Sequence, residues 1–388
     1  MNTPTESLPR AVVPLRGFIP SLEGMRAFAA IGIIVTHVAF QTGAASSPVM
    51  GRIWGRFDLT VAIFFALSGF LLWRPHAAQA RGQGSAQPIT KYLWSRAVRI
   101  LPAYWVVVVL VLLFLPNTGG SWRVWAANLS LTQVFVPLTL TEGMTQMWSL
   151  SVEVSFYLLL PLLGLLMAGL RGAATRYRIP LLFLAAIATL AWAFVPVSTP
   201  EAIHHDNWLP GYFPWFATGM LLAEYSTRRE SWLHRLAARR VIVAGIALTA
   251  FVLSATPLAG PQGLVRPEPW QFEAKIVLGA VLALALLAPL VLADRGRHRI
   301  LEHPVTLALG RWSYGIFIWH LVILAMVFPV FGIIPFSGHF VLVLIVTVAL
   351  SIPVAAASYS LVEEPARRAL HRGRADTATA TRATSAAS

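Results

Sequence analysis

Long apolar segments recur along the whole of this chain, and they limit its fold more than any other feature. The hydrocarbon core of a membrane is about 30 Å thick, a distance that about 20 residues of α-helix can cross. Only 12% of the 388 residues are charged, about half the share in a typical soluble domain. We therefore predict an all-α polytopic membrane protein, because lipid-exposed backbone must satisfy its own hydrogen bonds.

The sequence predicts about ten transmembrane helices, and its lysine and arginine residues predict their orientation. The spans lie at about 25–42, 57–73, 98–115, 152–170, 179–196, 211–226, 241–258, 273–293, 304–331 and 338–362. With the N-terminus in the cytoplasm, 25 of the 30 Lys and Arg residues lie on the inner side, and the outer ones are Arg52, Arg56, Arg123, Arg266 and Lys275. Because positive residues favour the cytoplasmic side, both termini are predicted to be cytoplasmic.

These spans divide the chain into three regions. Residues 1–24 form a cytoplasmic N-terminal arm, 25–362 form one transmembrane domain, and 363–388 form a cytoplasmic tail that is largely disordered by composition. The net charge of +14 follows mostly from the topology, since the basic residues are spread over short loops. No nucleic-acid partner is therefore expected.

No metal site is expected either. The chain has no cysteine, which excludes a thiol nucleophile, disulfides and cysteine-based metal sites. The run His204-His205-Asp206 falls on an outer loop. Adjacent histidines in a loop are more typical of solvated residues than of metal ligands.

Arg26 and His37 share one face of the first predicted span. They are eleven residues apart, which is about three helical turns or roughly 16 Å, so His37 lies deep while Arg26 lies near the aqueous edge. Ionisable residues within a span are costly and are usually functional. We predict that His37 is a general base that takes a proton from a hydroxyl as the oxygen attacks a thioester. A packing histidine and an arginine that merely anchors the topology are the alternatives.

Arg96 and Arg99 lie at the inner end of the third predicted span. They are three residues apart on one helical face, with Pro102 in a position suited to the first turn of the span. Two forked cations on one face match a phosphate-rich ligand. The alternative is again a pair of juxtamembrane anchors.

Glu153 opens the fourth predicted span from the outer side. It follows the interfacial Trp148 by five residues, which places it about 7 Å into the span. A carboxylate at this depth is costly unless it is paired. We hypothesise that Glu153 orients or charges the His37 imidazole, as a carboxylate does in a catalytic triad. The alternative is a structural ion pair.

Three further residues are candidates. His320 lies near mid-depth in the ninth predicted span, and it is either a second catalytic or substrate-orienting histidine or a packing residue. Tyr314 lies in the same span, six residues before it. Ser68 and Gly69 form a small notch between aromatic residues of the second span, which lets another helix or an acyl chain approach.

Six motifs follow one another along the chain. They are Leu22-Glu23-Gly24-Met25-Arg26 with a ten-residue gap to His37, Phe64-Phe65-Ala66-Leu67-Ser68-Gly69-Phe70, Arg96-x-x-Arg99-Ile100-x-Pro102, Trp148-Ser149-Leu150-Ser151-Val152-Glu153, Ser313-Tyr314 through to His320, and Glu363-Glu364-Pro365. In this order and at these depths, they resemble acyltransferase family 3, the bacterial integral-membrane O-acyltransferases. The resemblance covers about residues 18–368.

The resemblance implies transfer of an acyl group, usually acetyl, from a cytoplasmic acyl-CoA to a hydroxyl. The acceptors it implies are envelope glycolipids, polysaccharides or natural-product sugars, and the location it implies is the bacterial inner membrane. It also implies roles for Arg26 and His37, with Arg96 and Arg99 in the coenzyme site. Some relatives carry a C-terminal esterase-like domain, which we do not expect in this sequence.

One position departs from the family pattern. Relatives often carry an aspartate shortly before the Phe64-Phe65 pair, where this chain has Ala62. Asp58 lies one helical turn earlier on the same face and is a candidate substitute.

A second class of protein fits the buried ionisable residues. A proton-coupled secondary transporter or flippase would use His37, Glu153 and His320 as a proton relay. No internal repeat is visible to support it, and only the acyltransferase needs to bind acyl-CoA.

Overall fold

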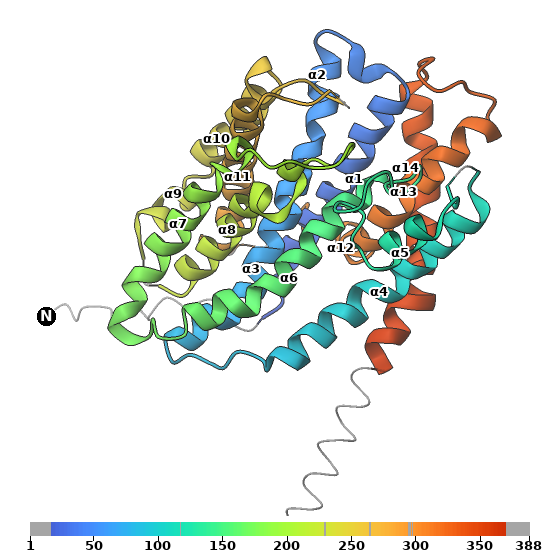
Figure 1. Ribbon diagram of the computed structural model, residues 1–388. Coiled ribbons are helices and arrows are strands. Elements are labelled where there is room, and N and C mark those ends of the chain that lie inside the picture. The colour runs from blue at the N-terminus through green and yellow to red at the C-terminus, as the bar shows by residue number, and fades with distance from the viewer. Residues whose placement is uncertain are drawn as a thin grey trace, which may run out of the picture.

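The computed structural model describes residues 17–116, 118–228, 230–263, 265–293, 296 and 298–369. Most of the predicted N-terminal arm and the tail from residue 370 lie outside the described residues. Within the described ranges the regular structure is entirely helical, with no β-strand. This confirms the predicted all-α class, and Figure 1 shows the helices assembled into one bundle.

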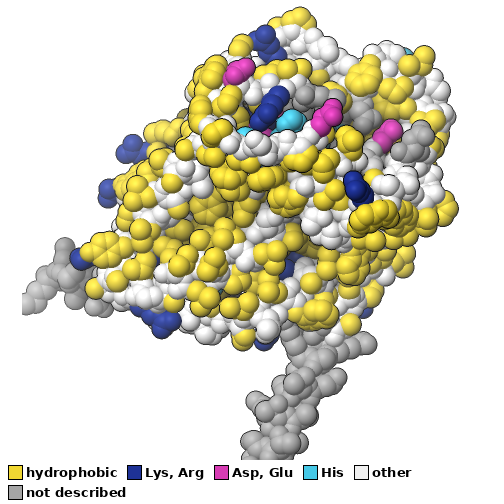
Figure 2. Space-filling view, viewed as in Figure 1, with side chains coloured by type: hydrophobic (Ala, Val, Ile, Leu, Met, Phe, Trp, Pro, Cys, Tyr) yellow, Lys and Arg dark blue, Asp and Glu magenta, His cyan; other side chains and the backbone are white. Residues whose placement is uncertain are grey.

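Among the described residues, eight helical segments are long and apolar enough to cross a membrane. They are Pro20–Gln41 (α1), Met50–Ala80 (α2, residues Met50–Gly55, with α3, Thr60–Ala80), Ile89–Phe114 (α4), Thr145–Leu166 (with α6, Trp148–Leu166), Gly172–Phe194 (with α7, Arg178–Thr189), Pro269–Leu292 (α11), Ser313–Val330 (α13) and Phe340–Ala369 (with α14, Phe340–Ser358). A ninth candidate is the pair α9 (Trp232–Ala238) and α10 (Arg240–Ser254), bent by 89° at their junction. Figure 2 shows few charged side chains over the broad hydrophobic middle of one flank, as a lipid-facing surface requires.

The predicted span at 211–226 is a helix of a different character. It corresponds to α8 (Leu209–Ser226), which falls outside the apolar candidates. Most of α8 is buried, and it packs on α3, α11 and α7. Because protein surrounds this helix, its apolar content need not match that of a lipid-facing span. The count of ten membrane crossings stays a prediction.

Two boundaries differ from the predicted ones. The span predicted at 304–331 is divided into α12 (Pro304–Arg311) and α13. The last helix continues through a π-helical turn, Tyr359–Glu363, to residue 369, beyond the predicted end of the domain.

Helices α1 and α3 join two groups of helices. Helix α3 packs on α8 and α11 on one side, whereas α1 packs on α12, α13 and α14 on the other; both groups are visible in Figure 1. The contact of α3 with α8 depends on two glycines. A Cβ at Gly69 would lie 2.1 Å from Phe216 O, and one at Gly219 would lie 1.8 Å from Ala66 O. The prediction that the notch beside Ser68 admits another helix is therefore confirmed at Gly69.

A buried carboxylate ties α3, α7 and α8 together. Glu224 on α8 is fully buried. It accepts hydrogen bonds from Arg81 at 2.7 Å, Arg178 at 2.7 Å and the Trp73 indole at 2.8 Å. The two arginines lie at the end of α3 and the start of α7, so one carboxylate fixes three helix ends.

We expect Glu224→Ala to lower the free energy of unfolding by about 3 kcal/mol, because two guanidinium groups lose their buried counter-charge. Unfolding of the detergent-solubilised protein measures the loss. The matched control is Glu364→Ala, which breaks the exposed 2.6 Å pair with Arg368 and should cost less than about 1 kcal/mol. Equal losses in the two variants would contradict a structural role for the Glu224 network.

Candidate active site

Three arginines from two helices line one cavity of the bundle. Arg26 comes from α1, and Arg96 and Arg99 come from α4. Arg26 is paired with Glu23, one turn earlier on its own helix, at 2.7 Å. Arg96 and Arg99 form no ion pair within the part of the chain that the structure describes. The three arginines outnumber the one carboxylate that lines the arginine cavity, Glu153, and this excess of positive charge favours an anionic ligand.

Glu153 belongs to this arginine cavity. Its Oε1 accepts hydrogen bonds from the Ser68 hydroxyl on α3 and, at 2.6 Å, from the Tyr157 hydroxyl on α6. The structure thus brings Glu153 and Ser68 together, whereas it places His37 in a different cavity. Within the described residues no hydrogen bond joins Glu153 to His37, so the structure shows no direct contact through which Glu153 would orient or charge the imidazole. The Nδ1 atom of the His37 ring instead meets another residue.

That residue is His320. The Nδ1 atom of His37 on α1 lies 2.9 Å from Nε2 of His320 on α13, and the two rings stack with centroids 5.1 Å apart. His320 is fully buried. Two candidates that are 283 residues apart in sequence therefore form one histidine pair.

The hydrogen bonds of His320 assign the tautomer of both rings. His320 Nδ1 contacts the carbonyl oxygens of Phe317 at 2.8 Å and Ile316 at 3.1 Å. Carbonyl oxygens only accept, so in the neutral ring His320 Nδ1 carries the hydrogen and Nε2 is an acceptor. His37 Nδ1 must then donate to it, which leaves His37 Nε2 as the unprotonated nitrogen. This nitrogen can accept a proton from a substrate.

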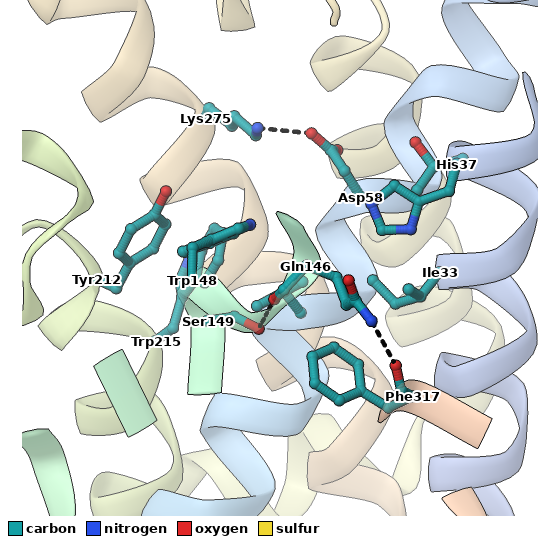
Figure 3. Close-up of a pocket in the computed structure, with 12 residues that line it drawn as sticks. Ile33, His37, Asp58, Gln146, Trp148, Ser149, Tyr212, Trp215, Lys275 and Phe317 are labelled. Carbon is teal, nitrogen blue, oxygen red and sulfur yellow. Dashed lines mark hydrogen bonds and ion pairs between the residues drawn. The ribbon is translucent and has the colours of Figure 1, made fainter. Parts of the chain in front are cut away.

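His37 lines a second cavity (Figure 3), which we call the histidine cavity. Asp58 in the short helix Arg56–Leu59 faces Lys275 of α11 across a 2.6 Å ion pair. Figure 3 shows three aromatic side chains opposite His37, from Trp148, Tyr212 and Trp215. Gln146 lies between them and donates a hydrogen bond to the Phe317 carbonyl at 3.3 Å.

Sequence reasoning placed Asp58 near the site but missed Lys275 and Gln146. The charge distribution in the sequence predicts Lys275 only as a topology residue on the outer side. It lies inside the apolar helix α11, so the rule that identified His37 could have identified Lys275 as well. Gln146 carries no charge and comes before α6, and no sequence signal distinguishes it.

The two cavities adjoin. Val61, Ser149 and Phe317 line both of them, and we call these three residues the partition. Tyr314 lies on the arginine side, where its hydroxyl donates to the Ile100 carbonyl at 2.8 Å and ties α13 to α4. A group held in the arginine cavity can therefore approach the histidine cavity at the partition.

The class of protein is an integral-membrane acyltransferase. A family model described as an acyltransferase domain matches residues 19–356, most of the chain. The chain belongs to acyltransferase family 3, and the predicted resemblance is confirmed.

Named relatives support the same class at low identity. The peptidoglycan O-acetyltransferase OatA of Listeria monocytogenes is 24% identical over 376 residues, which cover 91% of this chain and 56% of that protein. The acyltransferase MdmB of Streptomyces mycarofaciens is 28% identical over 326 residues, 79% of each chain. The putative peptidoglycan O-acetyltransferase YrhL of Bacillus subtilis is 25% identical, with 90% and 55% covered.

The chain thus spans little more than half the length of the two peptidoglycan relatives. No solved structure gives a significant match to it. Together, the family and the relatives support an O-acyltransferase as the enzyme class.

Proposed function

We propose that this protein transfers an acyl group, acetyl in the first instance, from cytoplasmic acyl-CoA to a hydroxyl of an envelope glycolipid, polysaccharide or natural-product sugar. One observation carries the proposal: a cavity with three arginines adjoins, at the partition, a cavity lined by a histidine with a free ring nitrogen. The arginine cavity suits a phosphate-rich acyl donor, and the histidine cavity suits removal of a proton from the acceptor hydroxyl.

Arg26, Arg96 and Arg99 would hold the donor. The phosphates of coenzyme A carry several negative charges, and the unpaired guanidinium groups of Arg96 and Arg99 can each offer a forked pair of donors. Glu153 holds Ser68 and Tyr157 in the same cavity, so we assign Glu153 a positioning role there. Tyr314 keeps α13 against α4 at its wall.

His37 would supply the proton transfers. The bound thioester supplies an acyl carbon and a thiolate leaving group. His37 Nε2 takes the proton of the acceptor hydroxyl as its oxygen forms the new C–O bond. When the C–S bond breaks, the imidazolium gives this proton to the sulfur. The products are then an ester and free coenzyme A, with His37 neutral again.

His320 is a positioning residue in this scheme, since it reaches the substrate only through His37. Without the acceptor nitrogen of His320, no partner would hold the His37 proton on Nδ1, so His37 Nε2 would no longer be kept unprotonated. We expect His320→Leu to lower kcat by roughly tenfold to a hundredfold. In His320→Gln, the side-chain oxygen can again accept from His37 Nδ1, so much of the activity should return. Failure of Gln to do better than Leu would contradict the tautomer role.

The proposal includes an orientation. The distribution of Lys and Arg favours cytoplasmic termini, and with this orientation the arginine cavity would face the cytoplasm of a bacterial inner membrane and the histidine cavity would face the outside. Residues 25–362 would form the catalytic domain, with 1–24 and 363–388 in the cytoplasm.

Thioester turnover by purified protein in liposomes tests the function. We would supply radiolabelled acetyl-CoA and a crude envelope-lipid extract, and compare wild type with His37→Ala. Label that moves into the lipid fraction only with wild type is the expected result. Folded protein that neither binds coenzyme A nor transfers the label would contradict the proposal.

A further inference from the structure

A right-angled bend separates the short helix α9 from α10. The two helices meet at Arg239 with an angle of 89° between them, and Figure 1 shows both at the edge of the bundle. Helix α10 exposes the large apolar side chains of Val241, Leu248 and Val252, and Val241 is 87% exposed. An exposed apolar face of this kind suits contact with lipid. With α10 against the lipid chains, α9 lies along the surface of the membrane.

Helix α9 has one buried side and one exposed side. Leu233 and Ala237 are buried, and the helix packs on α11. Trp232 is 58% exposed, and its ring contacts Tyr225 of α8 edge to face, with centroids 6.4 Å apart. Arg235 follows Trp232 by three residues, so the two side chains lie only about 60° apart around the helix axis. The exposed side therefore carries an aromatic ring next to a guanidinium group.

Three exposed arginines belong to this short segment, namely Arg235, Arg239 and Arg240. None of them forms an ion pair with a residue that the structure describes. Guanidinium groups bind phosphates through paired hydrogen bonds. Basic residues beside an exposed tryptophan are typical of helices that lie among lipid headgroups, and they attract anionic lipids.

The combination of charge and aromatic ring favours one kind of partner. A neutral headgroup would leave the three arginines without counter-ions. A soluble anion would pair with the arginines but would leave the Trp232 indole exposed to water. An anionic phospholipid satisfies both, because its phosphate meets the guanidinium groups while the indole lies at the boundary between headgroups and acyl chains.

We propose that the exposed side of α9 is a docking surface for anionic phospholipids. Arg235, Arg239 and Arg240 hold the lipid phosphates, and Trp232 anchors the helix among the headgroups. None of these four residues lines the arginine cavity or the histidine cavity. The docking surface is therefore separate from the candidate active site, and its test does not depend on acyl transfer.

A single fluorescent label on α9 tests the docking surface. The chain has no cysteine, so Ala238→Cys, at an exposed position on α9, provides one thiol for a bimane label. The labelled full-length protein is placed in phosphatidylcholine nanodiscs that contain a small share of nitroxide-labelled phosphatidylglycerol. A parallel sample contains phosphatidylcholine with the nitroxide at the same acyl position. The ratio of the two quenching values measures enrichment of the anionic lipid at α9.

We expect this ratio to be at least about five, the enrichment that a single arginine at a membrane surface supplies. In Arg235→Gln/Arg239→Gln/Arg240→Gln the ratio should fall to about one, while quenching by phosphatidylcholine persists. Trp232→Ala should instead weaken quenching by both lipids and leave the ratio above one. Loss of folding cannot produce these two different patterns.

The matched control carries the same label on α5 (Trp122–Leu129) through Ala126→Cys. This short helix also has an exposed tryptophan, Trp122, but its one arginine is Arg123. We expect the ratio at this position to be less than about half of that on α9. Comparison of the two positions separates a built surface from the effect of any exposed arginine.

Three outcomes would overturn the proposal. Equal ratios on α5 and α9, or an unchanged ratio in the triple arginine variant, would show that the arginines of α9 select no lipid. A ratio of about one before any arginine is replaced would show that α9 touches the membrane without a preference for anionic headgroups. A label that neither lipid quenches would place α9 away from the membrane.

Discussion

His37→Ala should lower kcat for acyl transfer by about a thousandfold or more, within the range that a positioned general base contributes. The alanine variant loses the imidazole that lines the histidine cavity, and the fully buried His320 does not line it. Coenzyme A binding should be almost unchanged, since the arginine cavity does not include His37. Label transfer and equilibrium coenzyme binding on the same preparation measure both quantities.

The matched control for this prediction is His204→Ala. His204 lies exposed on a loop between α7 and α8, so its loss should change neither quantity. If His37→Ala turns over at the wild-type rate, His37 is not the general base. Loss of coenzyme binding together with turnover would indicate a folding defect instead.

The double variant Arg96→Ala/Arg99→Ala should weaken coenzyme A binding by about a thousandfold. A hydrogen bond between charged groups contributes about 1.5–3 kcal/mol, and the two guanidinium groups form no competing ion pair within the described chain. Binding is best measured in low salt, where the wild-type contact is strongest. The difference from wild type should narrow as the salt concentration rises.

Arg171→Ala is the control for this variant. Arg171 is exposed on the loop between α6 and α7, so it tests whether removal of any arginine weakens binding. If the double variant binds coenzyme A as tightly as wild type does, Arg96 and Arg99 do not bind the donor and serve only as topology anchors. A binding loss of similar size in Arg171→Ala would show a general effect of surface charge.

The sequence predicted the helical class and most of the spans, because lipid imposes a simple rule on length and polarity. That rule works poorly for α8, whose surroundings are protein. The same rule predicts one span where the structure has two helices, α12 and α13, because an apolar sequence does not show that the helix breaks at Trp312.

The same limits apply to the candidate site. Ionisable residues at depth are visible in sequence, so His37, His320 and Glu153 could all be named. Their partners could not, because pairing depends on how helices far apart in the chain pack together. Depth alone predicts that Glu153 contacts His37. In the structure α6 packs against α3, and Glu153 accepts a hydrogen bond from Ser68 instead. Gln146, an uncharged residue, became visible only through the cavity that it lines.

The partition of Val61, Ser149 and Phe317 has a consequence for the cell. If the two cavities receive their substrates from opposite faces of the membrane, the partition is the place where they adjoin, so it also bears on the leakage of ions. Two of its three side chains are apolar, which opposes leakage of protons down the membrane potential. The same narrow wall would limit how bulky an acyl group can cross it. The partition must therefore both block ions and limit the size of the acyl group. We expect that replacing its side chains with smaller ones would let protons leak across the membrane before it allows larger acyl donors to react.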